Sequence, residues 1–94
     1  MMNAFVVRRR AELLEAQLDD ELVGLHLDQG QCYGFNETAT RIWSLIEQPM
    51  PFAQLCDVLM REYEVNEETC TRQLQQLLEE MQQDGLVAME LLPT

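Results

Sequence analysis

Three thiols and one imidazole are the first side chains of this sequence to consider for nucleophilic, basic or metal-binding chemistry: Cys32, Cys56, Cys70 and His26. A metal site needs several His, Cys or acidic ligands at fixed spacing, and these scattered residues do not supply it. His26 falls on the polar side of a predicted strand, without an evident partner to make it a general base. We therefore expect no catalytic residue, no metal and no cofactor, and predict that the chain is not an enzyme.

The three cysteines differ in their predicted surroundings. Cys56 and Cys70 fall on the apolar stripes of predicted helices, which is typical of small core residues. Cys32 is expected near the surface as a modifiable thiol, but no neighbour marks it as a nucleophile. An odd number of cysteines without CxxC spacing favours reduced thiols and a cytoplasmic protein.

The charge balance argues against nucleic acid as a partner. The net charge is −11, from 17 acidic and six basic residues, whereas nucleic-acid binders normally carry a basic patch. Three of the arginines each follow an acid by four residues, which is the helical spacing of a surface ion pair. The expected pairs are Glu37–Arg41, Asp57–Arg61 and Glu68–Arg72.

Arg8, Arg9 and Arg10 are interpreted as a solvated tail rather than a binding arm. The amino-terminal stretch MMNAFVVRRR does not resemble a signal peptide, because its basic residues follow the short apolar run instead of preceding it. The apolar runs elsewhere are only a few residues long, so we expect no membrane-spanning segment.

Three segments alternate apolar and other side chains with the period of a strand: residues 13–18, 21–27 and 31–35. Asp19-Asp20 and the segment around Gly30 supply tight turns between them. The sequence thus predicts a three-stranded antiparallel sheet. The side chains expected to share one face of each strand are Leu14, Ala16 and Leu18; Val23, Leu25 and Leu27; and Tyr33 and Phe35.

Three helices are predicted to follow the sheet, because the apolar period changes to 3.6 residues after Asn36. Asn36 and Asn66 suit N-caps, Pro51 suits a first helical position, and Gly85 suits a C-cap. The first helix carries the only tryptophan, which is expected to be a buried anchor against the sheet, and LVAME adds a short extended tail. The predicted fold is therefore α+β, with three strands followed by three helices.

The stretch LDQGQCYGFNETATRIWSLI resembles the PqqD-like family, the precursor-recognition domains of ribosomally made, post-translationally modified peptides. The similarity rests on a Gly-containing turn, the Cys32-Tyr33 pair, Phe35-Asn36 and Ile42-Trp43. It covers residues 13–88, the core of what we expect to be a single domain over residues 1–94. Cys32 stands where the family commonly has an aromatic residue, and Gln73 where it often has Asp.

The resemblance implies a winged-helix-like fold that binds a leader peptide without catalysis. The leader would add as a strand to the segment 31–35 and lie beside the third helix. The domain would then present the precursor to a maturation enzyme, such as a radical-SAM enzyme or a leader peptidase.

The sequence supports strand addition independently, because the third strand of a meander is an edge with unpaired backbone groups. Gly34 either lets another backbone approach closely or relieves crowding beside Trp43. We also expect that the apolar residues of the third helix cannot all point at one core, so that some face the peptide. The expected peptide-binding residues are Cys32, Tyr33, Gly34, Phe35, Gln73, Leu74, Leu77 and Met81.

The alternative function is a winged-helix transcriptional regulator, since three helices beside a small sheet can present a recognition helix. The predicted third helix carries one arginine against five acids, and such a surface repels DNA. The adaptor is therefore preferred. The sequence does not specify the precursor peptide, the maturation enzyme or the oligomeric state.

Overall fold

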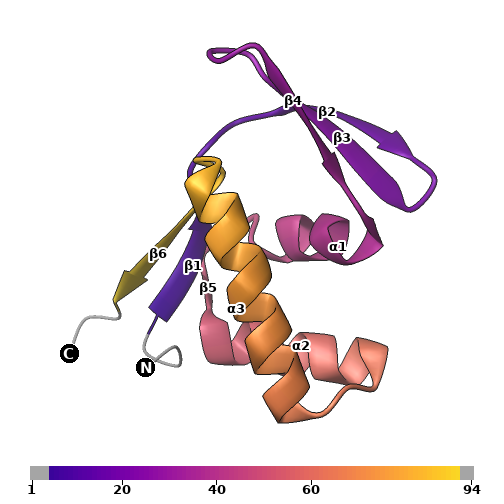
Figure 1. The fold of residues 1–94 in the computed structure, drawn as a ribbon, viewed down its shortest axis with the longest axis vertical. Coiled ribbons are helices and arrows are strands. Elements are labelled where there is room, and N and C mark those ends of the chain that lie inside the picture. Colours follow the sequence, from indigo (N-terminus) through magenta and orange to yellow (C-terminus); the bar gives the residue numbers. More distant parts are fainter. Residues whose placement is uncertain (1–4, 92–94) are drawn as a thin grey trace.

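The computed structural model describes residues 5–91, and its antiparallel sheets and three helices confirm the predicted α+β class (Figure 1). Residues 1–4 and 92–94 of the predicted domain lie outside the described part. The strands are β1 (Phe5–Arg9), β2 (Leu14–Leu18), β3 (Glu21–His26), β4 (Gln31–Phe35), β5 (Met50–Pro51) and β6 (Val87–Leu91). The helices are α1 (Glu37–Leu45), α2 (Phe52–Tyr63) and α3 (Glu67–Gln83).

The predicted meander is the sheet β2–β3–β4, in which β2 and β4 are the edges. Asp19 and Gly30 take positive φ angles of 56° and 68° in the two turns, which lets the strands reverse over a few residues. One face of this sheet packs on α1, and the buried Leu22 and Gly24 of β3 lie on that face with Phe35 of β4.

Leu14, Ala16 and Leu18 share one face of β2, as predicted, but the interpretation of which side of β3 is polar needs correction. All five residues of β2 are exposed, and Val23 and Leu25 of β3 lie on the face turned away from α1. The side of β3 interpreted as polar is the one that packs inward, and His26 on that side is half-buried. The alternation of side chains predicted the strand period correctly. It did not predict which side of β3 packs on α1, because Gly24 and His26 on that side are not apolar side chains.

A second sheet, β5–β1–β6, was not predicted. The interpretation of Arg8–Arg10 as a solvated tail is wrong for Arg8 and Arg9, which are half-buried and pair with β6 as part of β1. Val7 beside them is fully buried, and β1 also pairs with β5. The extended segment at LVAME is confirmed as β6. The expected core of residues 13–88 thus leaves out all of β1 and the end of β6. The apolar run of β1 is short, and its partners lie far away in the sequence.

The predicted helix boundaries depend on caps that the structure confirms. Asn36 Oδ1 accepts the Ala39 amide at 2.9 Å, and Asn66 Oδ1 accepts the Thr69 amide at 2.8 Å. Pro51 is the N-cap of α2 rather than its first helical residue. Gly85 takes φ = 75° after α3. There the Leu86 amide donates to Met81 O at 2.9 Å, closing a Schellman motif.

Trp43 is buried at the contact between α1 and the sheet, as predicted, with 1% of its surface exposed. Its ring centroid lies 5.5 Å from that of Phe35. Its indole N–H donates to Glu15 Oε2 at 3.0 Å. The Arg9 guanidinium lies 4.4 Å from the ring centroid and also donates to the Trp43 carbonyl. Residues from β1, β2 and β4 thus converge on one side chain of α1.

The predicted i,i+4 ion pairs do not form among the described residues. Arg41 binds Glu62 of α2 through two nitrogens, with Nη2 2.7 Å from Oε2, so this arginine joins α1 to α2. Arg61 donates to the backbone carbonyl of Asp57 instead of its carboxylate. Tertiary packing therefore overrides a local pair worth only about 0.3 kcal/mol.

Candidate functional site

The free edge of β4 is the starting point of the candidate site. β4 pairs with β3 on one side only, so part of its backbone N–H and C=O groups has no partner within the sheet. β4 leads directly into the Asn36 cap of α1, which fixes the strand relative to the helices. Such an edge can accept one more strand.

A groove of about 230 Å³ lies between β4 and the carboxyl-terminal half of α3. We call it the β4–α3 groove. Tyr33 and Phe35 line it from the strand, and Leu77 and Met81 line it from the helix. Glu80 and Asp84 add two carboxylates at the side of α3.

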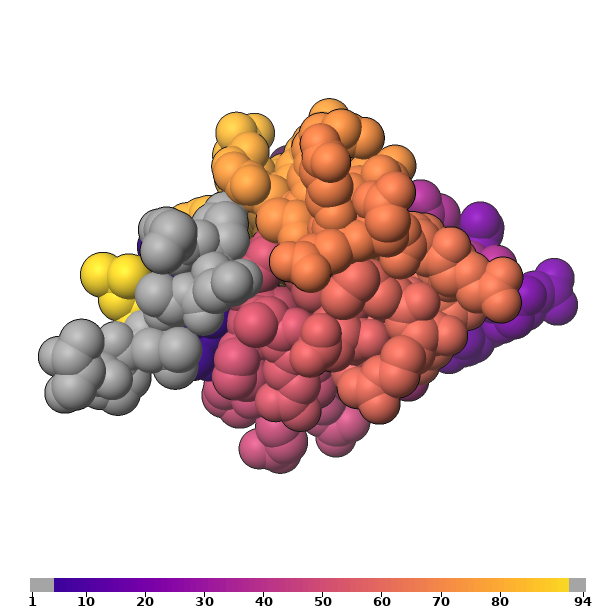
Figure 2. Space-filling model, turned by 90° about the horizontal axis from the view of Figure 1, so that it is seen from below, coloured from indigo at the N-terminus to yellow at the C-terminus, as the bar shows by residue number. Residues whose placement is uncertain are grey.

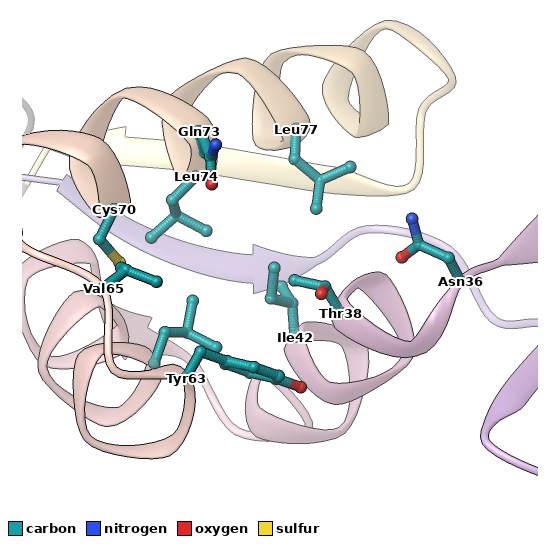
Figure 3. A pocket seen from close by; sticks show the side chains of 10 residues that line it. Asn36, Thr38, Ile42, Tyr63, Val65, Cys70, Gln73, Leu74 and Leu77 are labelled. Atoms are coloured by element: carbon teal, nitrogen blue, oxygen red, sulfur yellow. The ribbon is translucent and has the colours of Figure 1, made fainter.

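A larger hollow of about 480 Å³, which we call the helix pocket, opens further along α3. Its lining residues come from all three helices and the segments between them: Asn36, Thr38, Ile42, Leu59, Tyr63, Val65, Cys70, Gln73, Leu74 and Leu77. Figure 3 shows Leu74 and Leu77 reaching from α3 toward Ile42 and Thr38 of α1. Tyr63 lies on the same side as Ile42, across the hollow from α3. The wall is mainly apolar. Leu77 belongs to both hollows and marks their junction.

The structure brings seven of the eight predicted site residues to these two hollows. Five of them line the β4–α3 groove: Tyr33, Gly34, Phe35, Leu77 and Met81. Gln73, Leu74 and Leu77 line the helix pocket. Cys32 lines neither hollow and lies exposed on the face of the sheet turned away from α1.

The expectation that the apolar residues of α3 cannot all point at one core holds for Leu77 alone. Leu74, Leu78 and Met81 are all buried, with 0–4% of their surface exposed, and only Leu77 is partly accessible. Leu74 and Met81 can therefore form only the floor of the hollows. The contributions of Thr38, Tyr63 and Val65 were missed, because each comes from a different element and only the tertiary fold brings them together.

Gly34 does not relieve crowding beside Trp43. A Cβ atom added at this position would meet no atom within 4 Å, and Trp43 lies on the other side of the sheet. The space beside Gly34 is open, which agrees with the alternative that another chain approaches there.

Cys32 and His26 line neither hollow, and the thiols of Cys56 and Cys70 are poor nucleophiles. Burial raises the pKa of Cys56 to about 11 and also raises the pKa of Cys70, so both thiols are protonated at neutral pH. His26 Nδ1 accepts the Gln29 amide at 3.3 Å within the turn. Within residues 5–91, no three His, Cys, Asp or Glu side chains lie close enough together to hold a metal ion.

Comparison with known proteins identifies the family. The family model described as "Coenzyme PQQ synthesis protein D (PqqD)" matches residues 21–87. The chain belongs to the PqqD family. This confirms the resemblance found in the sequence, and the matched range contains β3, β4 and all three helices of this PqqD-family chain. No curated protein matches the sequence.

One solved structure is similar to this PqqD-family chain over most of its length. It is "TbiB1 in Complex with the TbiA(beta) Leader Peptide", with a TM-score of 0.74 and 31% sequence identity. The match covers 84% of this chain and 93% of that one. The similar structure is therefore a leader-peptide complex of a protein with a similar fold.

Proposed function

We propose that this protein is an adaptor that binds the leader of a ribosomally made precursor peptide by strand addition to β4. The observation that carries the proposal is the free β4 edge beside a groove that continues into the helix pocket. The leader peptide in the similar TbiB1 structure supports a peptide ligand. The adaptor then presents the bound precursor to a modifying enzyme or a leader protease.

Backbone pairing alone does not account for useful affinity. Four or five new hydrogen bonds contribute about 0.5–1.5 kcal/mol each. Ordering a flexible leader costs about 2–5 kcal/mol, which nearly cancels them. Micromolar binding requires about 8 kcal/mol in total. The remainder comes from apolar leader side chains, at about 1.5–3 kcal/mol for each one that is fully buried.

The two hollows are the sites where those side chains bury. The helix pocket, with its floor at Ile42 and Leu74 and its wall at Tyr63, accommodates one large apolar or aromatic side chain. The β4–α3 groove takes a second, smaller one next to Phe35 and Leu77. Gln73 is exposed at the helix pocket and contacts the peptide there.

The proposed role is binding without catalysis. The protonated thiols of Cys56 and Cys70 are poor nucleophiles, and Cys32 has no basic neighbour in its strand. Incubation of the chain with its leader-bearing precursor should therefore leave the mass of the peptide unchanged. A mass change in the absence of any second protein would contradict the adaptor role.

The binding mode is tested by NMR titration of the labelled chain with leader peptide. Amide shifts should cluster in residues 31–36 and 70–81. Shifts that gather on α2 while β4 stays unmoved would rule out strand addition.

A charge-matched pair of variants tests the helix pocket. Gln73→Arg places a long cation at its rim and should weaken leader binding by about tenfold, or 1.4 kcal/mol. Gln82→Arg adds the same charge to an exposed position of α3 outside both hollows, and should bind the leader normally. Equal losses in both variants would indicate a general charge effect instead of a pocket.

A further inference from the structure

The face of the β2–β3–β4 sheet turned away from α1 is apolar and exposed. We call it the outer sheet face, and its apolar side chains and thiol are Leu14, Ala16, Leu18, Val23, Leu25 and Cys32, with Glu21 at its end opposite Leu18. The strand register aligns them in rows across the sheet, with Leu14 opposite Leu25 and Leu25 opposite Cys32. Leu14 and Leu18 keep 63% and 62% of their surface exposed, so no described element covers this face. Apolar clusters of this kind on a soluble domain mark interaction surfaces.

The charges around this face select the chemistry of the partner. The segment 11–35 contains six acidic residues and no arginine or lysine. Asp19, Asp20 and Glu21 lie exposed at one end of the sheet, and Asp28 lies exposed at the other. An apolar surface with acidic ends is complementary to an apolar patch rimmed by arginine and lysine. A second copy of this chain, with a net charge of −11, would instead bring acids against acids.

The outer sheet face is also continuous with the proposed leader site. Cys32 and Gly34 of β4 point to this face, while the free backbone edge of the same strand is where the leader would pair. Figure 1 shows the sheet as an arm held above α1, and Figure 2 shows from below that it stands out to one side of α2 and α3. A protein docked on this arm would touch the strand that holds the peptide without covering the helix pocket.

We propose that the outer sheet face docks the maturation enzyme through an apolar patch of that enzyme bordered by basic residues. This inference rests on the proposed function, since it places the enzyme next to the bound leader. The leucines supply the apolar contact area. The acids at the ends of the sheet orient the complex and accelerate its formation.

The test compares substitutions of exposed leucines in the two sheets. Leu14→Gln/Leu18→Gln changes the outer sheet face, and Leu91→Gln changes a leucine that is 70% exposed on β6, in the other sheet. Each purified maturation enzyme encoded beside the gene for this chain is titrated with the leader-loaded chain. The double variant should raise the Kd for one enzyme by at least about tenfold, and Leu91→Gln should leave it within about twofold. All variants should bind the leader alone with native affinity.

The charge argument has its own measurement on the same complex. Added NaCl should weaken enzyme binding, because the acids at the ends of the sheet face basic groups. The variant Asp19→Asn/Asp20→Asn/Glu21→Gln should bind more weakly at low salt and lose much of that salt dependence. If the variant shows the same salt dependence as the native chain, the inference that basic residues of the enzyme face these acids is wrong.

Other outcomes separate this inference from the proposed function. Unchanged enzyme binding by the double leucine variant, or no binding by any of these enzymes, overturns the docking site while leader binding stands. Failure of the native chain to bind any leader overturns the proposed function instead. If sedimentation shows a dimer that the leucine substitutions dissociate, the face binds a second copy of this chain. If the native chain floats with lipid vesicles and the leucine variant does not, the face binds a lipid surface. Either result would overturn the proposal that it docks the maturation enzyme.

Discussion

Trp43 is the residue on which three strands and one helix depend at once. The Phe35 ring, the Glu15 carboxylate and the Arg9 guanidinium each contact it from a different strand. An arginine can lie flat on an indole while its nitrogens bind a carbonyl, so Arg9 is fixed instead of solvated. Composition alone does not distinguish such an arginine from one in a charged tail.

Replacement of Trp43 should have a large effect on stability. Trp43→Ala should lower the free energy of unfolding by about 3–5 kcal/mol, because it empties a fully packed site. Urea melts followed by circular dichroism measure this loss. Trp43→Phe keeps an apolar ring and should cost less. A loss below about 1 kcal/mol in the alanine variant would show that the contacts of Trp43 contribute little.

The three thiols should react at very different rates. Exposed Cys32 should be labelled quickly by a thiol reagent, whereas Cys56 and Cys70 should react only after unfolding in urea. The folded pKa of Cys56, about 11, lies above its ordinary value of 9.0. Its burial therefore stabilises the fold below pH 9, and this contribution is lost as the pH rises through 11. Mass spectrometry of labelled peptides at pH 7 and after denaturation counts the reactive thiols. Three equally fast thiols in the folded chain would contradict the burial.

At the level of elements, the strand β4 and the helix caps followed from the sequence, whereas the second sheet did not. Asn36, Asn66 and Gly85 act through local hydrogen bonds or a local φ angle, and a few adjacent residues contain that information. The pairing of β1 with β6 depends on residues about eighty positions apart. The same distinction holds for the site. β4 could be predicted from strand alternation and the α3 side from the family resemblance, but the contributions of Tyr63 and Val65 to the helix pocket could not.

Two glycines of neighbouring strands should respond oppositely to alanine. A Cβ at Gly34 would meet no atom within 4 Å, so Gly34→Ala should leave stability unchanged or raise it by about 0.4–1 kcal/mol. A Cβ at Gly24 would lie 2.6 Å from Leu13 Cδ1, so Gly24→Ala should displace Leu13 and destabilise the sheet. Thermal melts of the two variants give the comparison directly. Equal destabilisation by both would mean that Gly34 is not in open space.

At the level of the whole molecule, one core unites the two sheets and three helices. Buried side chains from β1, β3, β4, β6 and every helix belong to a single cluster. The helices within residues 5–91 are all too short or too polar to cross a membrane. The first strand, which lies outside the segment that matches the family, therefore belongs to the same core.

Adjacent valines of β1 test that dependence. Val7 is fully buried and Val6 only partly, although the two residues are chemically identical. Val7→Ala should cost about 2 kcal/mol, from two lost methyl groups and the cavity they leave, and Val6→Ala should cost clearly less. Chemical denaturation of both variants measures the difference. Equal and small losses would mean that β1 contributes little to the core.

The β1–β6 ladder has a consequence for synthesis of the chain on the ribosome. Phe5 pairs with Leu91, so the first described strand emerges early and waits for the last one to leave the exit tunnel. The β2–β3–β4 hairpins are local and can close much sooner, because short loops lose less entropy than long ones. During that interval the apolar side of β1 is unprotected, and the three arginines that follow Val7 are flanking charges of the kind that oppose aggregation of such a segment.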